Sequence, residues 1–117
     1  MQIETKFGQI TVNGTTYMHD IVIDVNGNAR RRSGIAKNIY GTDHQVCTEE
    51  IKDLLQGKPE AIIIGTGQYG SCQRFEAGVQ RECQRNNVRL IVEKTPSAIK
   101  TFEAMPGKKA ALFHVSC

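Results

Sequence analysis

Apolar residues alternate with polar ones in the first third of the chain and form unbroken runs further on. Residues 10–12 and 15–17 are strand-like and flank Asn13-Gly14, a dipeptide that strongly favours a two-residue hairpin turn. Two further strands are expected, at residues 3–7 and 20–25, the second ending at Asn26-Gly27. This alternation predicts antiparallel strands in the N-terminal part.

Residues 28–46 are polar and carry no periodic pattern. We predict an irregular loop there, of a length that is often functional or mobile. The run Arg30-Arg31-Arg32 lies within it and is expected to be solvated, with an anion-binding edge as the alternative.

From Thr48 onward, apolar stripes at helical spacing alternate with continuous apolar runs. The helices are expected at residues 48–56, 72–87 and 95–105, and the strands at 61–64, 88–92 and 110–115. A continuous apolar run is typical of a strand buried on both faces, and β-α-β connections make such strands parallel. We therefore predict a single layered α/β domain, residues 1–117, whose mixed central sheet combines a C-terminal β-α-β-α-β unit with N-terminal antiparallel strands.

The charge balance and aromatic content argue against a nucleic-acid-binding surface. Lys plus Arg is 15 and Asp plus Glu is 12, and the chain has 6% aromatic residues and no Trp. Nucleic-acid binders usually cluster basic residues on one face. No apolar run approaches the roughly 20 residues of a membrane-spanning helix, and no signal peptide is evident, so a cytoplasmic location is expected. The four cysteines are then expected to be free thiols.

A glycine-rich turn follows the first buried strand. Residues 65–70, Gly-Thr-Gly-Gln-Tyr-Gly, match Gly-x-Gly-x-x-Gly between a predicted strand and a predicted helix. Three parallel strands are too few for a dinucleotide fold, and Ser71 stands where a P-loop needs lysine. Two interpretations stay open: glycines required only for a tight turn, or a site for a phosphate or carboxylate. The predicted ligand-binding residues are Gly65, Thr66, Gly67, Gln68, Lys94 and Thr95.

Cys72 lies in the first turn of the predicted helix 72–87. A helix N-terminus lowers the pKa of a thiol, so Cys72 is a candidate reactive thiol, with His114 as its candidate neighbour in space. The alternative is an ordinary small buried residue. The three histidines have no metal-ligand spacing, so neither a metal nor a cofactor is expected, and no catalytic residue is assigned.

The order of several segments is recognisable. Residues 7–10 (Phe-Gly-Gln-Ile), 63–67 (Ile-Ile-Gly-Thr-Gly) and 113–114 (Phe-His), followed by Cys117, resemble the family of small α/β proteins that includes the adipogenesis-associated Mth-domain-containing protein and a mitochondrial complex I assembly factor. The resemblance implies a compact α/β domain with a mixed sheet. It also implies a largely uncharacterised family whose members with known roles bind or assemble partners without established catalysis.

The expected function is therefore a non-catalytic binding or assembly module with a protein partner. The alternative is a protein or enzyme that binds an anionic small molecule, such as a nucleotide or phosphate, at the Gly65-Thr66-Gly67 turn. The resemblance implies that Gly70 is incidental, because a third glycine is not a hallmark of that family, and this weakens the dinucleotide match.

Overall fold

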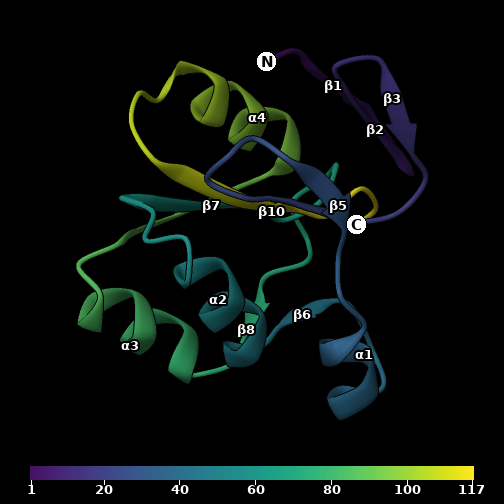
Figure 1. Ribbon diagram of the computed structural model, residues 1–117. Coiled ribbons are helices and arrows are strands. Elements are labelled where there is room, and N and C mark those ends of the chain that lie inside the picture. The colour runs from purple at the N-terminus through teal and green to yellow at the C-terminus, as the bar shows by residue number, and fades with distance from the viewer.

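A five-stranded mixed sheet forms the centre of the protein in the computed structural model, which describes residues 1–117 (Figure 1). The strands, in order across the sheet, are β5 (Ala29–Arg31), β4 (Ile21–Ile23), β10 (Lys109–Phe113), β7 (Ala61–Gly65) and β9 (Arg89–Glu93). β10, β7 and β9 are parallel, whereas β4 runs antiparallel to β10 and β5 antiparallel to β4. The predicted C-terminal unit with parallel strands is confirmed.

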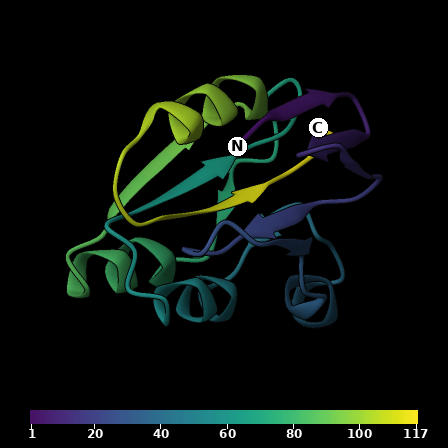
Figure 2. The same cartoon turned by 45° about the horizontal axis from the view of Figure 1, so that its top comes forward.

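β7 is the central strand of the parallel unit, and all of its residues are buried. Gly65 at its end pairs with Phe113 on one side and with Glu93 on the other. The three parallel strands therefore end at one edge of the sheet, and Figure 2 shows them pointing in a common direction. Helices cover both faces of the sheet, which explains why the isoleucine run of β7 does not alternate with polar residues.

Two layers enclose the sheet. On one face lies α4 (Thr95–Ala104), and on the other lie α2 (Thr48–Leu55) and α3 (Gly78–Arg85) (Figures 1 and 2). Successive residues of β7 alternate between the two cores: Ile63 packs with Phe102 of α4, and Ile62 packs with Ile51 of α2. Phe102 also meets Phe113 edge to face, with ring centroids 5.9 Å apart.

The N-terminal hairpin is part of a separate three-stranded antiparallel sheet beside α4 (Figure 1). Its strands are β1 (Ile3–Lys6), β2 (Gln9–Val12) and β3 (Thr15–Tyr17). Asn13 and Gly14 both have positive φ, as the predicted two-residue turn requires, and Val12 pairs with Thr15 across it. The antiparallel prediction is confirmed.

The prediction of an irregular loop at residues 28–46 is wrong. The segment contains β5, the helix α1 (Ile35–Tyr40) and β6 (Gln45–Val46), and β6 pairs in parallel with β8 (Arg74–Phe75). These elements are short, and β5 is a polar edge strand, so hydrophobic periodicity does not reveal them. The expected solvation of the arginine run is also wrong at Arg32, which is buried.

The helix predicted at residues 72–87 is confirmed only in its second half. α3 begins at Gly78, and residues 72–77 form a loop and β8 instead. Phe75 packs against the same apolar cluster as Val79 and Cys83, but from a strand. The spacing of four residues between Phe75, Val79 and Cys83 therefore arises because all three pack into one core, and not because they lie on one continuous helix. No helix of the protein is long and apolar enough to cross a membrane.

Candidate functional site

Three segments meet at the carboxyl ends of the parallel strands, where ligands of open α/β sheets tend to bind. They are the turn after β7, the junction of β9 with α4, and the tail after β10. Thr95 joins all three, because its hydroxyl oxygen accepts the Gly67 N–H at 2.9 Å and donates to the His114 carbonyl at 2.6 Å. Because each segment follows one of the three strands that the sequence predicts to be parallel, the sequence predicts that they meet at one edge, and the structure confirms this.

Gly67 allows the C-terminal tail to pass directly over the turn. Its φ is +106°, and a Cβ there would lie 2.1 Å from the Ser116 carbonyl oxygen. A side chain at this position would therefore collide with the backbone of the tail. The turn leads into a loop and not into a helix. The interpretation that a glycine is required here only for close packing of the backbone explains Gly67.

Every backbone N–H group from Thr66 to Cys72 is already hydrogen-bonded within the protein. Gln68 donates to the Ser116 carbonyl at 2.9 Å, and both Tyr69 and Ser71 donate to the Cys117 carbonyl, at 3.0 and 3.3 Å. The others donate to Glu93, Thr95, Gly67 and Thr66. An anion bound by the amides of Gln68, Tyr69 or Ser71 would have to displace the tail.

The structure brings only some of the predicted ligand-binding residues together. Gly65, Thr66, Gly67 and Thr95 are buried together at the strand ends, whereas Lys94 is exposed beside Gly70. Gln68 is half-buried, and its amide oxygen lies 3.4 Å from the Thr5 hydroxyl. Ligand binding by this set stays a prediction.

Two aromatic rings are exposed on this edge. Phe7 lies in the turn between β1 and β2 and is 57% exposed, and Tyr69 is 78% exposed. Their ring centroids are 5.8 Å apart. The Gly8 N–H donates to the Val115 carbonyl at 2.8 Å and so fixes the hairpin turn against the tail. Both rings are thus held on the same ordered surface.

Cys72 and Cys117 form a disulfide, so the prediction that all four cysteines are free thiols is wrong for this pair. Their Cα atoms are 5.7 Å apart, within the usual range for a disulfide. Cys72 lies in the loop and not in a helix. The histidine beside it is His44 and not His114: the His44 Nδ1 is 3.3 Å from Cys72 Sγ and 3.0 Å from Cys117 Sγ.

Cys47 and Cys83 are free and buried. Burial raises the pKa of both thiols, because the thiolate would lose its hydration in the core. Neither thiol is therefore suited to nucleophilic chemistry, which needs the thiolate.

A buried ionic network lies beneath the tail, centred on Arg32, whose side chain is 3% exposed. Its guanidinium makes two hydrogen bonds to Glu50, of 2.6 and 3.0 Å, and one to Asp20, of 3.1 Å. It also donates to the carbonyls of Asp43 and Gln45. The carboxylates outweigh the effect of burial and raise the pKa of Arg32. Arg32 is thus a structural cation with its donors engaged, and not part of a solvated run.

Asp20 connects this network to the tail. Its carboxylate accepts the Val115 N–H and the His114 Nδ1–H, each at 3.0 Å. Burial alone would raise the pKa of Asp20, but the His114 hydrogen bond and charge, the Val115 N–H and Arg32 together lower it. His114 Nε2 is buried without a hydrogen-bond partner. The imidazole therefore serves to hold Asp20.

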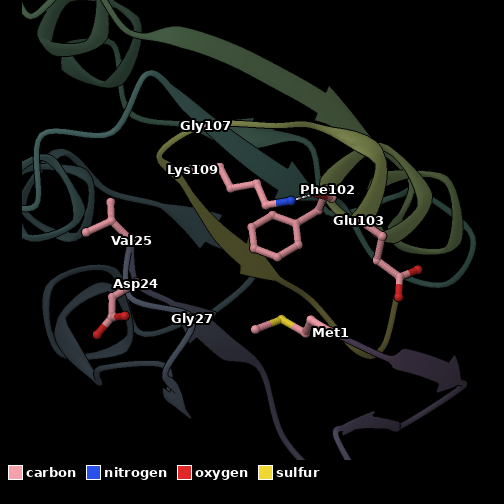
Figure 3. Close-up of a pocket in the computed structure, with 8 residues that line it drawn as sticks. All are labelled: Met1, Asp24, Val25, Gly27, Phe102, Glu103, Gly107 and Lys109. Atoms are coloured by element: carbon pink, nitrogen blue, oxygen red, sulfur yellow. Dashed lines mark hydrogen bonds between the residues drawn. The ribbon is translucent and has the colours of Figure 1, made fainter.

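The five main cavities of the protein range in volume from about 50 to about 390 Å³. One lies at the opposite end of β10, between the C-terminus of α4 and the turn after β4, with a volume of about 130 Å³ (Figure 3). Lys109 projects over the Phe102 ring there and donates to the carbonyls of Phe102 and Met105. Its ammonium group is therefore already bound within the protein. Pockets for drug-sized ligands usually span ~300–1,000 Å³, so this cavity does not suit one.

Over residues 3–113 the chain matches the family described as protein of unknown function (DUF498/DUF598). The chain belongs to the DUF498/DUF598 family. The conserved hypothetical protein PH1505 from Pyrococcus horikoshii OT3 is 30% identical, with a TM-score of 0.90 and 100% of each chain covered. MT938 is 33% identical, with a TM-score of 0.81 and coverage of 97% of this chain and 96% of that one.

More distant structures share the DUF498/DUF598 fold alone. An outer membrane protein from Bartonella henselae is 17% identical, with a TM-score of 0.74 over 97% of this chain and 92% of that one. None of the curated proteins matches the chain. The comparisons thus establish the family and the fold of this DUF498/DUF598 protein.

The sequence analysis missed Arg32, Glu50 and His44 as residues of this edge. Glu50 had a local signal, because an acid three residues after a helix N-cap often accepts the N-cap N–H, as it does here from Cys47 at 3.0 Å. Cys117 was expected in the tail at this edge and among the residues that carry the family resemblance, but not as the disulfide partner of Cys72. The roles of Arg32 and His44 depend on contacts between distant segments.

Replacing Arg32 should destabilise the protein far more than replacing a neighbouring arginine. Arg32→Met leaves Glu50 and Asp20 buried without their cation, which typically costs about 3–5 kcal/mol. Arg30→Met is the matched control, since Arg30 and its partner Asp53 are 48% and 56% exposed, and an exposed pair contributes less than about 1 kcal/mol. Urea denaturation of both variants measures the difference. Equal losses would contradict the structural role of Arg32.

Stability should fall in acid partly through Asp20. Its pKa is lower in the folded chain than in the unfolded one, so the unfolded state binds more protons as the pH falls below ~5. The contribution of Asp20 is complete near neutral pH and is lost as the pH falls through its folded-state pKa. Asp20→Asn should be less stable at pH 7 and show a shallower loss of unfolding free energy from about pH 5 to pH 2. Parallel curves for wild type and variant, from denaturation at each pH, would contradict this.

Proposed function

We propose that this DUF498/DUF598 protein is a non-catalytic binding or assembly module that recognises a protein partner at the carboxyl edge of its parallel strands. The observation that carries the proposal is the exposed aromatic pair, Phe7 at 57% and Tyr69 at 78% exposure, with ring centroids 5.8 Å apart. Aromatic residues are enriched at protein interfaces, and Tyr is frequent among the residues that dominate binding energy.

The backbone around these rings favours binding because it is already ordered. The Gly8 N–H is held by the Val115 carbonyl and the Tyr69 N–H by the Cys117 carbonyl. A partner therefore does not have to immobilise a flexible loop, and the entropic cost of association is reduced. Full burial of a phenylalanine side chain is worth about 1.5–3 kcal/mol, so two rings form a useful hydrophobic anchor.

The alternative is a small-molecule or anion site, enzymatic or not, at Gly65, Thr66 and Gly67. It ranks second because the amides from Thr66 to Cys72 are bonded to the tail and to neighbouring strands. The chain's resemblance to the adipogenesis-associated Mth-domain family, whose characterised members bind or assemble partners, supports the first proposal. We further propose a cytoplasmic protein that acts on neither membranes nor nucleic acid.

Replacing both rings should abolish partner capture without unfolding the protein. Phe7→Ser and Tyr69→Ser together remove most of the apolar area of the pair, and such exposed substitutions typically change stability by only ~0.5 kcal/mol each. Chemical crosslinking in native cell extract followed by affinity capture, quantified by mass spectrometry, should recover a partner with wild type and lose it with the double variant.

Ile39→Ser is the matched control, because Ile39 is also 57% exposed but lies on α1, away from this edge. It should retain the partner. Capture that is equal for wild type and the double variant, or that is lost with Ile39→Ser as well, would exclude the aromatic pair as the recognition surface.

A further inference from the structure

We propose that Cys72, Cys117 and His44 form a binding site for a thiophilic divalent metal ion, of which zinc is the best example, when the disulfide is reduced. The ligand atoms of these three residues all lie within 4.8 Å of one another. The proposal concerns a chemistry different from partner binding and does not rest on the aromatic pair.

The three side chains come from three separate parts of the chain. Cys72 belongs to the loop after β7, Cys117 to the tail after β10, and His44 to the segment just before β6. His44 Nδ1 faces both sulfurs, at 3.3 Å from Cys72 and 3.0 Å from Cys117. One nitrogen and two sulfurs are thus presented to a common point, and this is the donor set that zinc prefers.

Asp43 provides independent support. One of its carboxylate oxygens lies 3.8 Å from His44 Nε2, on the side of the ring opposite the sulfurs. Histidines that bind metals through one nitrogen usually direct the other toward a carboxylate or carbonyl, which orients the ring and increases its basicity. Asp43 lies on that side of the ring, at a distance longer than a hydrogen bond, and its backbone is held because its carbonyl accepts a hydrogen bond from Arg32.

The arrangement supplies three protein ligands, so a tetrahedral ion would keep one position for water or another ligand. His44 and Cys117 lie toward the surface, since the His44 side chain is 58% exposed, whereas Cys72 is 2% exposed. The open position would face solvent. Three protein ligands with an open fourth position are typical of catalytic zinc, whereas structural zinc sites have four protein ligands.

The oxidised and metal-bound forms exclude each other. A dithiol reductant supplies the electrons and protons that convert the Cys72–Cys117 bond to two thiols, and the reductant becomes a disulfide. The divalent ion then binds the two sulfurs as thiolates and displaces their two protons to solvent. Either form ties the loop after β7 to the tail, so the ion replaces the covalent link without requiring a new fold.

The test is titration with zinc alone, using a chromophoric indicator as competitor, on chain reduced with a phosphine and then freed of reductant under argon. Reduced wild type should bind one zinc per chain, and the oxidised chain none. Cys72→Ser and Cys117→Ser should each lose tight binding, and Asp43→Asn should weaken it by about 10-fold to 100-fold. Substitution with Co²⁺ should give the thiolate charge-transfer band of a tetrahedral site.

Cys83→Ser is the matched control, because Cys83 is a free buried cysteine outside the cluster. It should bind zinc like wild type. Because Cys72 is buried and its variant can lose structure, circular dichroism accompanies each titration. If Cys72→Ser unfolds, the result for Cys117→Ser, at a more exposed position, decides the test. Zinc affinity in the folded Cys117→Ser chain, or in the oxidised chain, equal to that of reduced wild type would overturn the proposal.

Discussion

The buried charge of Arg32 is the constraint on which the rest of this edge depends. A guanidinium that is withdrawn from water must be paired and fully hydrogen-bonded, or the fold loses several kcal/mol. Glu50 at the start of α2 and Asp20 before β4 supply the negative charges that pair with it. The carbonyls of Asp43 and Gln45 accept hydrogen bonds from its other N–H groups. One side chain therefore fixes β5, α2 and residues 43–45 relative to one another.

The same network positions the carboxyl edge of the parallel strands. Asp20, held by Arg32, accepts the Val115 N–H and so directs the tail after β10 across the turn after β7. Carbonyls of the tail then accept hydrogen bonds from amides of that turn, and the tail brings Cys117 to Cys72. On the other side, the carbonyls of Asp43 and Gln45 that bind Arg32 flank His44 in the chain, which explains why an exposed histidine reaches a nearly buried sulfur.

Local pattern was enough to predict the parallel unit but not the edge that it supports. The isoleucine run of β7 and the hairpin at Asn13-Gly14 are determined by residues adjacent in the sequence. Hydrophobic periodicity and turn chemistry were therefore enough to predict them. The same reasoning brought Gly65, Gly67 and Thr95 together correctly. Arg32 gives no such signal, since its partners include Glu50, 18 residues away. The Cys72–Cys117 pair spans 45 residues and depends on the tail crossing the turn, which no spacing rule encodes.

The chemistry left at this edge follows from what the tail occupies. A glycine turn at the end of a parallel strand suggests backbone amides that are free to bind an anion. Here three of those amides donate to the carbonyls of Ser116 and Cys117, and the others are bonded elsewhere within the protein. What remains on the surface is the aromatic pair and the imidazole of His44, which lies beside the sulfurs of Cys72 and Cys117. These groups bind apolar protein surfaces and soft metal ions better than phosphates. Gly67 therefore serves the packing of the tail, and the packing of the tail limits which groups of this edge are left to bind a ligand.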